Sequence, residues 1–105
     1  TPLAYIREKI RSNDVSDSIH VTELNGLPVI EIENKEEETI TYIYEYEDNL
    51  MELYVSEEVE PLLEAGTPLF DIKEFEVEQK EKQLYVSVEN ASGERNQIVL
   101  TLHTT

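Results

Sequence analysis

Hydrophobic and polar residues alternate along most of this chain, which is the period of a β-strand with one buried face. From about residue 19 onward, the alternating segments are separated by short polar turns, as in successive antiparallel hairpins. The pattern therefore predicts a mostly antiparallel sheet of about seven strands, built from one hairpin after another.

The first dozen residues follow a different period. Leu3, Ile6 and Ile10 recur every three or four residues and so share one face of a helix, with Pro2 at the first helical position and Asn13–Asp14 at the end. A helix this short is marginal alone. We therefore expect its apolar face to pack on the sheet and to give a two-layer α+β fold.

The first hairpin is expected to turn at Asn25–Gly26, a dipeptide that strongly favours a two-residue loop. This loop pairs Val21 with Ile30 and His20 with Glu31. One face then collects four apolar side chains: Ile19, Val21, Ile30 and Ile32. Because the turn and the hydrophobic pattern agree, the register is well specified.

The segment TITYIYEYEDNLMELYV, residues 39–55, is rich in tyrosine, and its rings could form either an exposed binding surface or a buried face. We place its turn at Asp48–Asn49, because both residue types tolerate positive φ. The tyrosines then oppose apolar residues: Tyr42 opposes Val55, Tyr44 opposes Leu53, and Tyr46 opposes Met51. We expect these rings to be buried and the glutamates Glu45, Glu47 and Glu52 to face solvent.

In this register, Ile43 and Tyr54 pair on the face opposite the three tyrosines. They need cover from another part of the chain, such as the apolar turn predicted at residues 61–63, or from a partner subunit. If they are exposed together, they are our candidate interaction patch.

Two further hairpins are predicted in the second half of the chain, separated by polar turns at residues 79–82 and 90–96. Alternation places the following residues on one face: Lys73, Phe75, Val77, Leu84, Val86 and Val88, followed by a last strand with Ile98, Leu100 and Leu102.

The net charge of −16 on 105 residues changes the functional picture. The first 14 residues carry a net charge of +1 and the remainder carries −17. So acidic a surface repels phosphate backbones, and we expect no nucleic-acid partner. The length fits one domain, spanning residues 1–105.

The residue types offer no pattern for catalysis. His20 is expected in a surface pair with Glu31, and His103 near the end of the chain is expected to be solvated. The chain has no cysteine, and its three glycines all lie in predicted turns and not in a phosphate-binding loop. The acidic runs at residues 36–38 and 45–48 do not match the spacing of a calcium loop. We therefore predict no enzyme activity, catalytic residue, cofactor or metal ligand.

Four segments carry a resemblance to a known class of proteins: LAYIREKIRSND, NGLPVIEI, TYIYEYEDNLMELYV and GTPLFDIKEFEVEQKEKQLYVSVENASGERNQIVLTL. They resemble an uncharacterised bacterial family of small membrane-anchored proteins, similar to pilins and to the minor pseudopilins of competence and secretion systems in Gram-positive bacteria. The resemblance implies a pilin-like fold with a hydrophobic N-terminal helix ahead of the sheet. Pro2 departs from an uninterrupted pilin-type helix.

The resemblance implies a structural or interaction role without chemistry. The domain would be the extracytoplasmic part of a longer protein, anchored through an N-terminal membrane segment that this sequence lacks, with other pilin-like or secretion-system subunits as partners. The alternative that the residues leave open is a module that binds sugar, peptide or calcium through the tyrosine-rich hairpin or its acidic rim.

Overall fold

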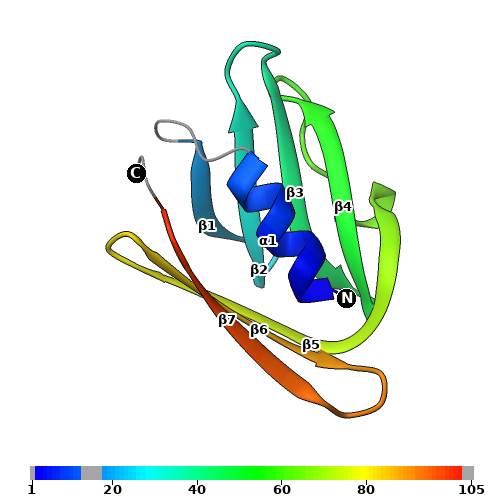
Figure 1. Cartoon of the computed structure of the whole chain (residues 1–105). Coiled ribbons are helices and arrows are strands. Elements are labelled where there is room, and N and C mark those ends of the chain that lie inside the picture. The colour runs from blue at the N-terminus through cyan, green and yellow to red at the C-terminus, as the bar shows by residue number, and fades with distance from the viewer. Residues whose placement is uncertain (1, 13–17, 103–105) are drawn as a thin grey trace.

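The computed structural model describes residues 2–12 and 18–102. It contains one α-helix, a short 3-10 turn and seven strands: α1 (Pro2–Ser12), β1 (Ile19–Leu24), β2 (Leu27–Asn34), β3 (Thr39–Tyr46), β4 (Asn49–Ser56), η1 (Leu63–Ala65), β5 (Thr67–Lys80), β6 (Gln83–Asn90) and β7 (Arg95–Thr101). The strands form one antiparallel sheet in chain order. The predicted α+β fold, with a helix ahead of seven antiparallel strands, is confirmed (Figure 1).

Strand β5 bends the sheet around the helix. Residues 67–71 pair with β4, and residues 72–80 pair with β6. The register shifts near Leu50 in the first ladder and between Ile72 and Glu74 in the second. A bulge of this kind inserts an extra residue and bends the strand. As a result, β5–β7 cross below α1, while β1–β4 stand behind it (Figure 1).

The main core lies between α1 and the concave side of the sheet. Ile6 and Ile10 of the helix are 0% and 2% exposed, and Leu3 packs against the same cluster, so the predicted helix face is confirmed. The sheet contributes residues from both of its halves: Ile19, Ile30, Ile32, Ile43, Leu50, Ile72, Phe75, Leu84, Val86 and Val88. The helix therefore holds the two halves of the bent sheet together.

The first hairpin follows the predicted register. Asn25 and Gly26 form the turn with φ values of 53° and 81°, and Val21 pairs with Ile30 as expected. His20 pairs with Glu31 across the same ladder. Positive φ at both turn positions matches the right-handed twist of the flanking strands.

The second hairpin turns one residue earlier than predicted. Glu47 and Asp48 occupy the turn, with φ values of 49° and 64°, and Asn49 belongs to β4. The Glu45 carboxylate accepts a hydrogen bond from the Asp48 N–H at 3.1 Å. Asn49 is also needed inside the sheet, because it pairs with Tyr46 on one side and Asp71 on the other.

The new register moves every pair by two residues and so preserves the faces. Tyr44 now opposes Met51, and Tyr42 opposes Leu53. Since side chains alternate with a period of two, a shift by two leaves each one on its predicted face. Tyr42 and Tyr44 are 6% and 0% exposed, which confirms their predicted burial, and Tyr46 is half-buried.

The tyrosine face is covered by the connection between β4 and β5, residues 57–66, which we call the strap. Leu63 of the strap is buried against Tyr42, Tyr44, Met51, Leu53 and Val29 in a second apolar cluster. The Tyr44 hydroxyl donates a hydrogen bond to the Leu63 carbonyl at 2.5 Å. The short turn predicted at residues 61–63 lies instead at Leu63–Ala65, and Leu62 is exposed. Leu63 covers the tyrosine face, and α1 covers the opposite face.

Three details of β5 and the turn after it differ from the sequence prediction. Its extra residue turns Lys73 to solvent, whereas simple alternation placed Lys73 beside Phe75 on the buried face. The strand also begins at Thr67, earlier than expected. Pro68 fits there because it lies at the irregular pairing with Met51, where a missing N–H is tolerated. The turn after β5 is only two residues long, at Glu81 and Lys82.

Two predicted features lie outside the described residues, namely the helix end at Asn13–Asp14 and the histidine His103. In the described part of the chain, no helix has the length and hydrophobicity that a membrane crossing requires.

Candidate functional site

The predicted patch of Ile43 and Tyr54 does not form. Ile43 pairs with Glu52, lies under α1 and is 0% exposed, whereas Tyr54 pairs with Thr41 and is 57% exposed. Two features separate these residues: α1 covers Ile43, and the earlier turn of the second hairpin places Glu52 instead of Tyr54 opposite Ile43. Tyr54 is left as a single exposed ring whose hydroxyl donates to the Glu37 carboxylate at 2.9 Å.

A polar clamp fixes α1 to β4. The Tyr5 hydroxyl donates a short hydrogen bond to one carboxylate oxygen of Glu52, and Lys9 Nζ lies 3.2 Å from the other. Burial raises the pKa of Tyr5 well above its ordinary value, and the bond to Glu52 and its negative charge raise it further. Glu52 was predicted to face solvent, but it faces the helix because α1 packs on its side of the sheet.

A small titratable group lies near the outer edge of β1 and β2. His20 Nε2 is 3.8 Å from a Glu33 oxygen, and nearly half of the His20 side chain is exposed. Burial raises the pKa of Glu31, the Glu33 carboxylate adds to this, and His20 opposes it. Burial and both of these carboxylates also raise the pKa of Tyr42. The group is a surface cross-strand cluster of the kind predicted for His20.

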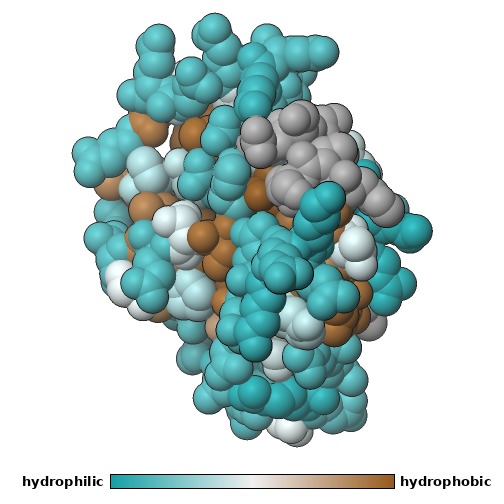
Figure 2. All heavy atoms as spheres, turned by 90° about the vertical axis from the view of Figure 1, so that its left-hand side faces the viewer, coloured by the Kyte–Doolittle hydropathy of each residue, from teal (hydrophilic) through white to brown (hydrophobic). Residues whose placement is uncertain are grey.

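The acidic runs do not converge on a metal-binding geometry in the described structure. Within residues 2–12 and 18–102, no group of three or more His, Asp or Glu side chains is arranged to hold a metal ion. Figure 2 shows polar residues over most of the β1 side of the molecule, with hydrophobic residues visible between them.

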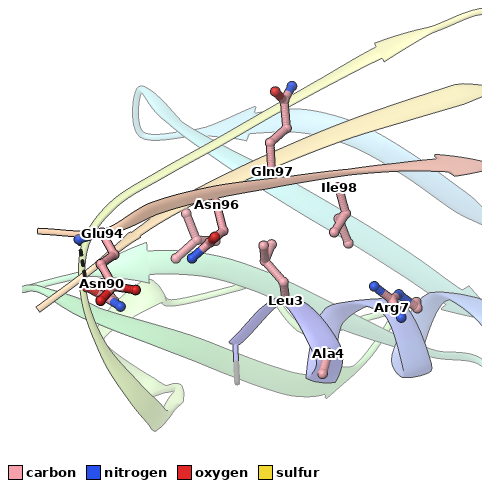
Figure 3. Close-up of a pocket in the computed structure, with 9 residues that line it drawn as sticks. Leu3, Ala4, Arg7, Asn90, Glu94, Asn96, Gln97 and Ile98 are labelled. Carbon is pink, nitrogen blue, oxygen red and sulfur yellow. Dashed lines mark hydrogen bonds between the residues drawn. The ribbon is translucent and has the colours of Figure 1, made fainter. Parts of the chain in front are cut away.

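A groove with both polar and apolar lining residues lies between α1 and the β6–β7 hairpin (Figure 3). Its volume is about 440 Å³, within the range of about 300–1,000 Å³ typical of ligand-binding clefts. The lining residues are Leu3, Ala4, Arg7, Val88, Asn90, Glu94, Asn96, Gln97 and Ile98. We call this site the α1–β7 groove.

One wall of the α1–β7 groove is formed by α1 and the other by the β6–β7 hairpin. Leu3 of the helix points toward β7, and Asn96 and Ile98 point back toward the helix, while Gln97 points to the opposite side of the strand (Figure 3). At the hairpin end, the Asn90 side chain accepts hydrogen bonds from the Ser92 and Glu94 N–H groups at 3.0 Å each. These bonds fix the turn and hold Glu94 at that end of the groove.

Sequence reasoning did not find the α1–β7 groove, because it depends on how the bent sheet meets the helix. The one local signal was the composition of the last strand. Of the seven strands, β7 (RNQIVLT) is the one that contains no acidic residue, although the chain has 24 Asp and Glu residues.

Comparison with known proteins gives a family but no characterised relative. No curated protein and no solved structure matches the chain. The profile of a domain of unknown function, DUF4860, matches residues 1–91. This match covers most of the chain, from α1 to the turn after β6, and the protein therefore belongs to the DUF4860 family.

Proposed function

We propose that this domain is a non-enzymatic interaction module. In this proposal, it is the extracytoplasmic part of a membrane-anchored, pilin-like protein and packs against other pilin-like or secretion-system subunits. The order of elements supports the proposal, because a helix followed by an antiparallel sheet is the order that the pilin-like resemblance implies.

The observation that carries the proposal is the placement of α1. Its apolar face is buried in the bent sheet, and its other face presents Ala4, Arg7, Glu8 and Arg11 to solvent. The helix has a net charge of +2, whereas residues 18–105 have a net charge of −16. A cationic helix face on an acidic body is suited to electrostatic contact with the acidic surface of another subunit.

The alternative function is a module that binds sugar, peptide or calcium through the tyrosine-rich hairpin or its acidic rim, and binding through the tyrosines required exposed rings. Tyr42 and Tyr44 are buried beneath the strap, so they cannot serve as a stacking platform. Among the tyrosines of that hairpin, only Tyr54 is exposed over more than half of its surface. No observation on the hairpin therefore favours this alternative over an interaction module.

The proposal is tested in the native organism with the full-length protein. Membrane fractionation and a lysine-reactive cross-linker should place it in the membrane fraction, in covalent complexes with other proteins. The double variant Arg7→Glu/Arg11→Glu should reduce these complexes at least fivefold, because it reverses the charge of the exposed helix face. Lys82→Glu, at the exposed turn after β5, is the matched control and should have no effect.

Two results would contradict the proposal. One is recovery of the full-length protein as a monomer in the soluble fraction. The other is a set of cross-linked complexes that is equally insensitive to the helix variant and to the control, while circular dichroism shows both to be folded.

A further inference from the structure

The α1–β7 groove lies beside an unpaired sheet edge. Strand β7 is the last strand of the sheet, and in the described structure only β6 pairs with it. The edge of a strand carries N–H and C=O groups without partners, and another extended chain can bind to them. The groove and the edge together form a site for an added strand.

Strand β7 lacks the features that usually protect an edge. It is seven residues long, has no proline or acidic residue, and pairs with β6 without a register shift. Its single charged residue is Arg95 at the first position, where it forms ion pairs with Glu74 and Glu76. Val99 is 51% exposed near the middle of the strand. Natural sheets commonly block such edges with charges, proline or bulges.

The groove also has a chemical direction. Glu94 lies at one end, Arg7 lies near Ile98 toward the other, and Leu3 lies between them (Figure 3). A strand antiparallel to β7 would present alternate side chains toward α1. Complementary side chains along it would be acidic beside Arg7, apolar over Leu3 and basic beside Glu94, in that order from its N-terminus.

We propose that the α1–β7 groove binds an extended segment of a partner protein as an eighth, antiparallel strand beside β7. The segment carries an acidic, an apolar and a basic residue at alternate positions. This inference rests on the proposed interaction function and specifies how one partner binds. A second copy of this chain is a poorer occupant, because two bodies with a net charge of −16 each repel one another.

The test uses the isolated protein labelled with ¹⁵N and a synthetic peptide, acetyl-Thr-Glu-Thr-Val-Thr-Lys-Thr-amide. Addition of the peptide should shift the amide resonances of β7 and of the first turn of α1, and should slow hydrogen exchange in β7. The same peptide with N-methyl groups on alternate residues of its edge-pairing side should bind at least tenfold more weakly. A peptide with the glutamate and lysine exchanged should also bind at least tenfold more weakly.

Two protein variants and one control variant locate the site. Ala4→Trp fills the groove from the helix side and should weaken binding at least tenfold, whereas Ser12→Trp, an exposed residue at the other end of α1, should not. Glu94→Lys should weaken binding, and a peptide with glutamate in place of its lysine should restore it. This charge exchange remains informative even if Ala4→Trp disturbs the helix.

Three outcomes would overturn the inference. The first is the absence of β7 shifts at millimolar peptide concentration in the folded protein. The second is equal binding of the N-methylated or charge-exchanged peptides. The third is a β7-dependent dimer of the protein alone, seen by sedimentation and abolished by Ala4→Trp, which would make a second copy the occupant. If any of these outcomes is found while cross-linked complexes persist in the native organism, the proposed interaction function still holds and only this binding mode is wrong.

Discussion

Replacing Gly66 with alanine should loosen the strap from the tyrosine face. Gly66 has an ordinary φ of −69°, so its backbone could accommodate any residue. Its constraint is space: a Cβ atom there would overlap the Tyr44 hydroxyl and lie 3.2 Å from the ring carbon Cζ. It would also lie 3.3 Å from the Glu52 carbonyl oxygen. The strap must therefore move, or the Tyr44 ring must give up its hydrogen bond to Leu63.

The size of the effect follows from these contacts. Overpacking a close-packed site costs about 1–3 kcal/mol. Tyr44→Phe removes one of two donors to the Leu63 carbonyl, which keeps the Gly66 N–H at 3.4 Å, so the loss should be about 0.5–1.5 kcal/mol. With the hydroxyl removed, the main clash of the new methyl group is relieved. The double variant should therefore lose about 0.5–3 kcal/mol less than the sum of the single losses.

The assay is urea unfolding followed by far-ultraviolet circular dichroism. Gly26→Ala is the matched control, because Gly26 has a φ of +81° and an added Cβ would meet nothing within 4 Å. Its loss of about 1–2 kcal/mol comes from the backbone alone and should be unchanged by Tyr44→Phe. If the losses of unfolding free energy for Gly66→Ala and Tyr44→Phe add up exactly in the double variant, the proposed contact between position 66 and the Tyr44 hydroxyl is refuted.

Three other predictions concern the helix and the titratable groups. Ile10→Ala should cost about 2–5 kcal/mol in urea unfolding, because the side chain is buried under the sheet, and a loss below about 0.5 kcal/mol would mean that α1 is not docked. Glu31 has a raised pKa in the folded state, so its stabilising contribution is complete below pH 4.5 and is lost as the pH rises. The change in thermal midpoint caused by Glu31→Gln should therefore be more favourable at pH 7 than at pH 3. An equal change in the midpoint at both pH values would contradict this. Tyr5 also has a raised pKa, so stability should fall above pH 10, and Tyr5→Phe should make that fall shallower in a pH series of urea midpoints.

The local parts of the fold could be predicted from the sequence. Asn25–Gly26 determined the first hairpin, because turn chemistry and strand alternation agreed there. The faces of β3 and β4 could also be predicted, because burying a row of glutamates in place of Tyr42 and Tyr44 would cost several kcal/mol per carboxylate. The turn of the second hairpin could not be predicted, since the pairing of Asn49 with Asp71 of β5 is a non-local contact.

The layer assignment was beyond the sequence pattern. Strand β3 is apolar on both faces, with Ile43 on one and Tyr44 on the other, and alternation cannot say which face receives the helix. The bulge that exposes Lys73 was not predicted either, because the prediction assumed regular alternation from Lys73 to Phe75. The α1–β7 groove arises from the bend in β5 and from the packing of the helix, which only the assembled fold provides.

The central claim is that the domain binds a partner through the α1–β7 groove. Its most direct test places a photo-reactive amino acid in the full-length protein in native cells, at Ala4 or Asn96 in the groove and at Ser12 or Thr67 outside it. The account predicts protein adducts at the two groove positions and at least fivefold fewer at the two outer positions. Adducts that are equally abundant at all four positions, or absent from the groove positions, would contradict it.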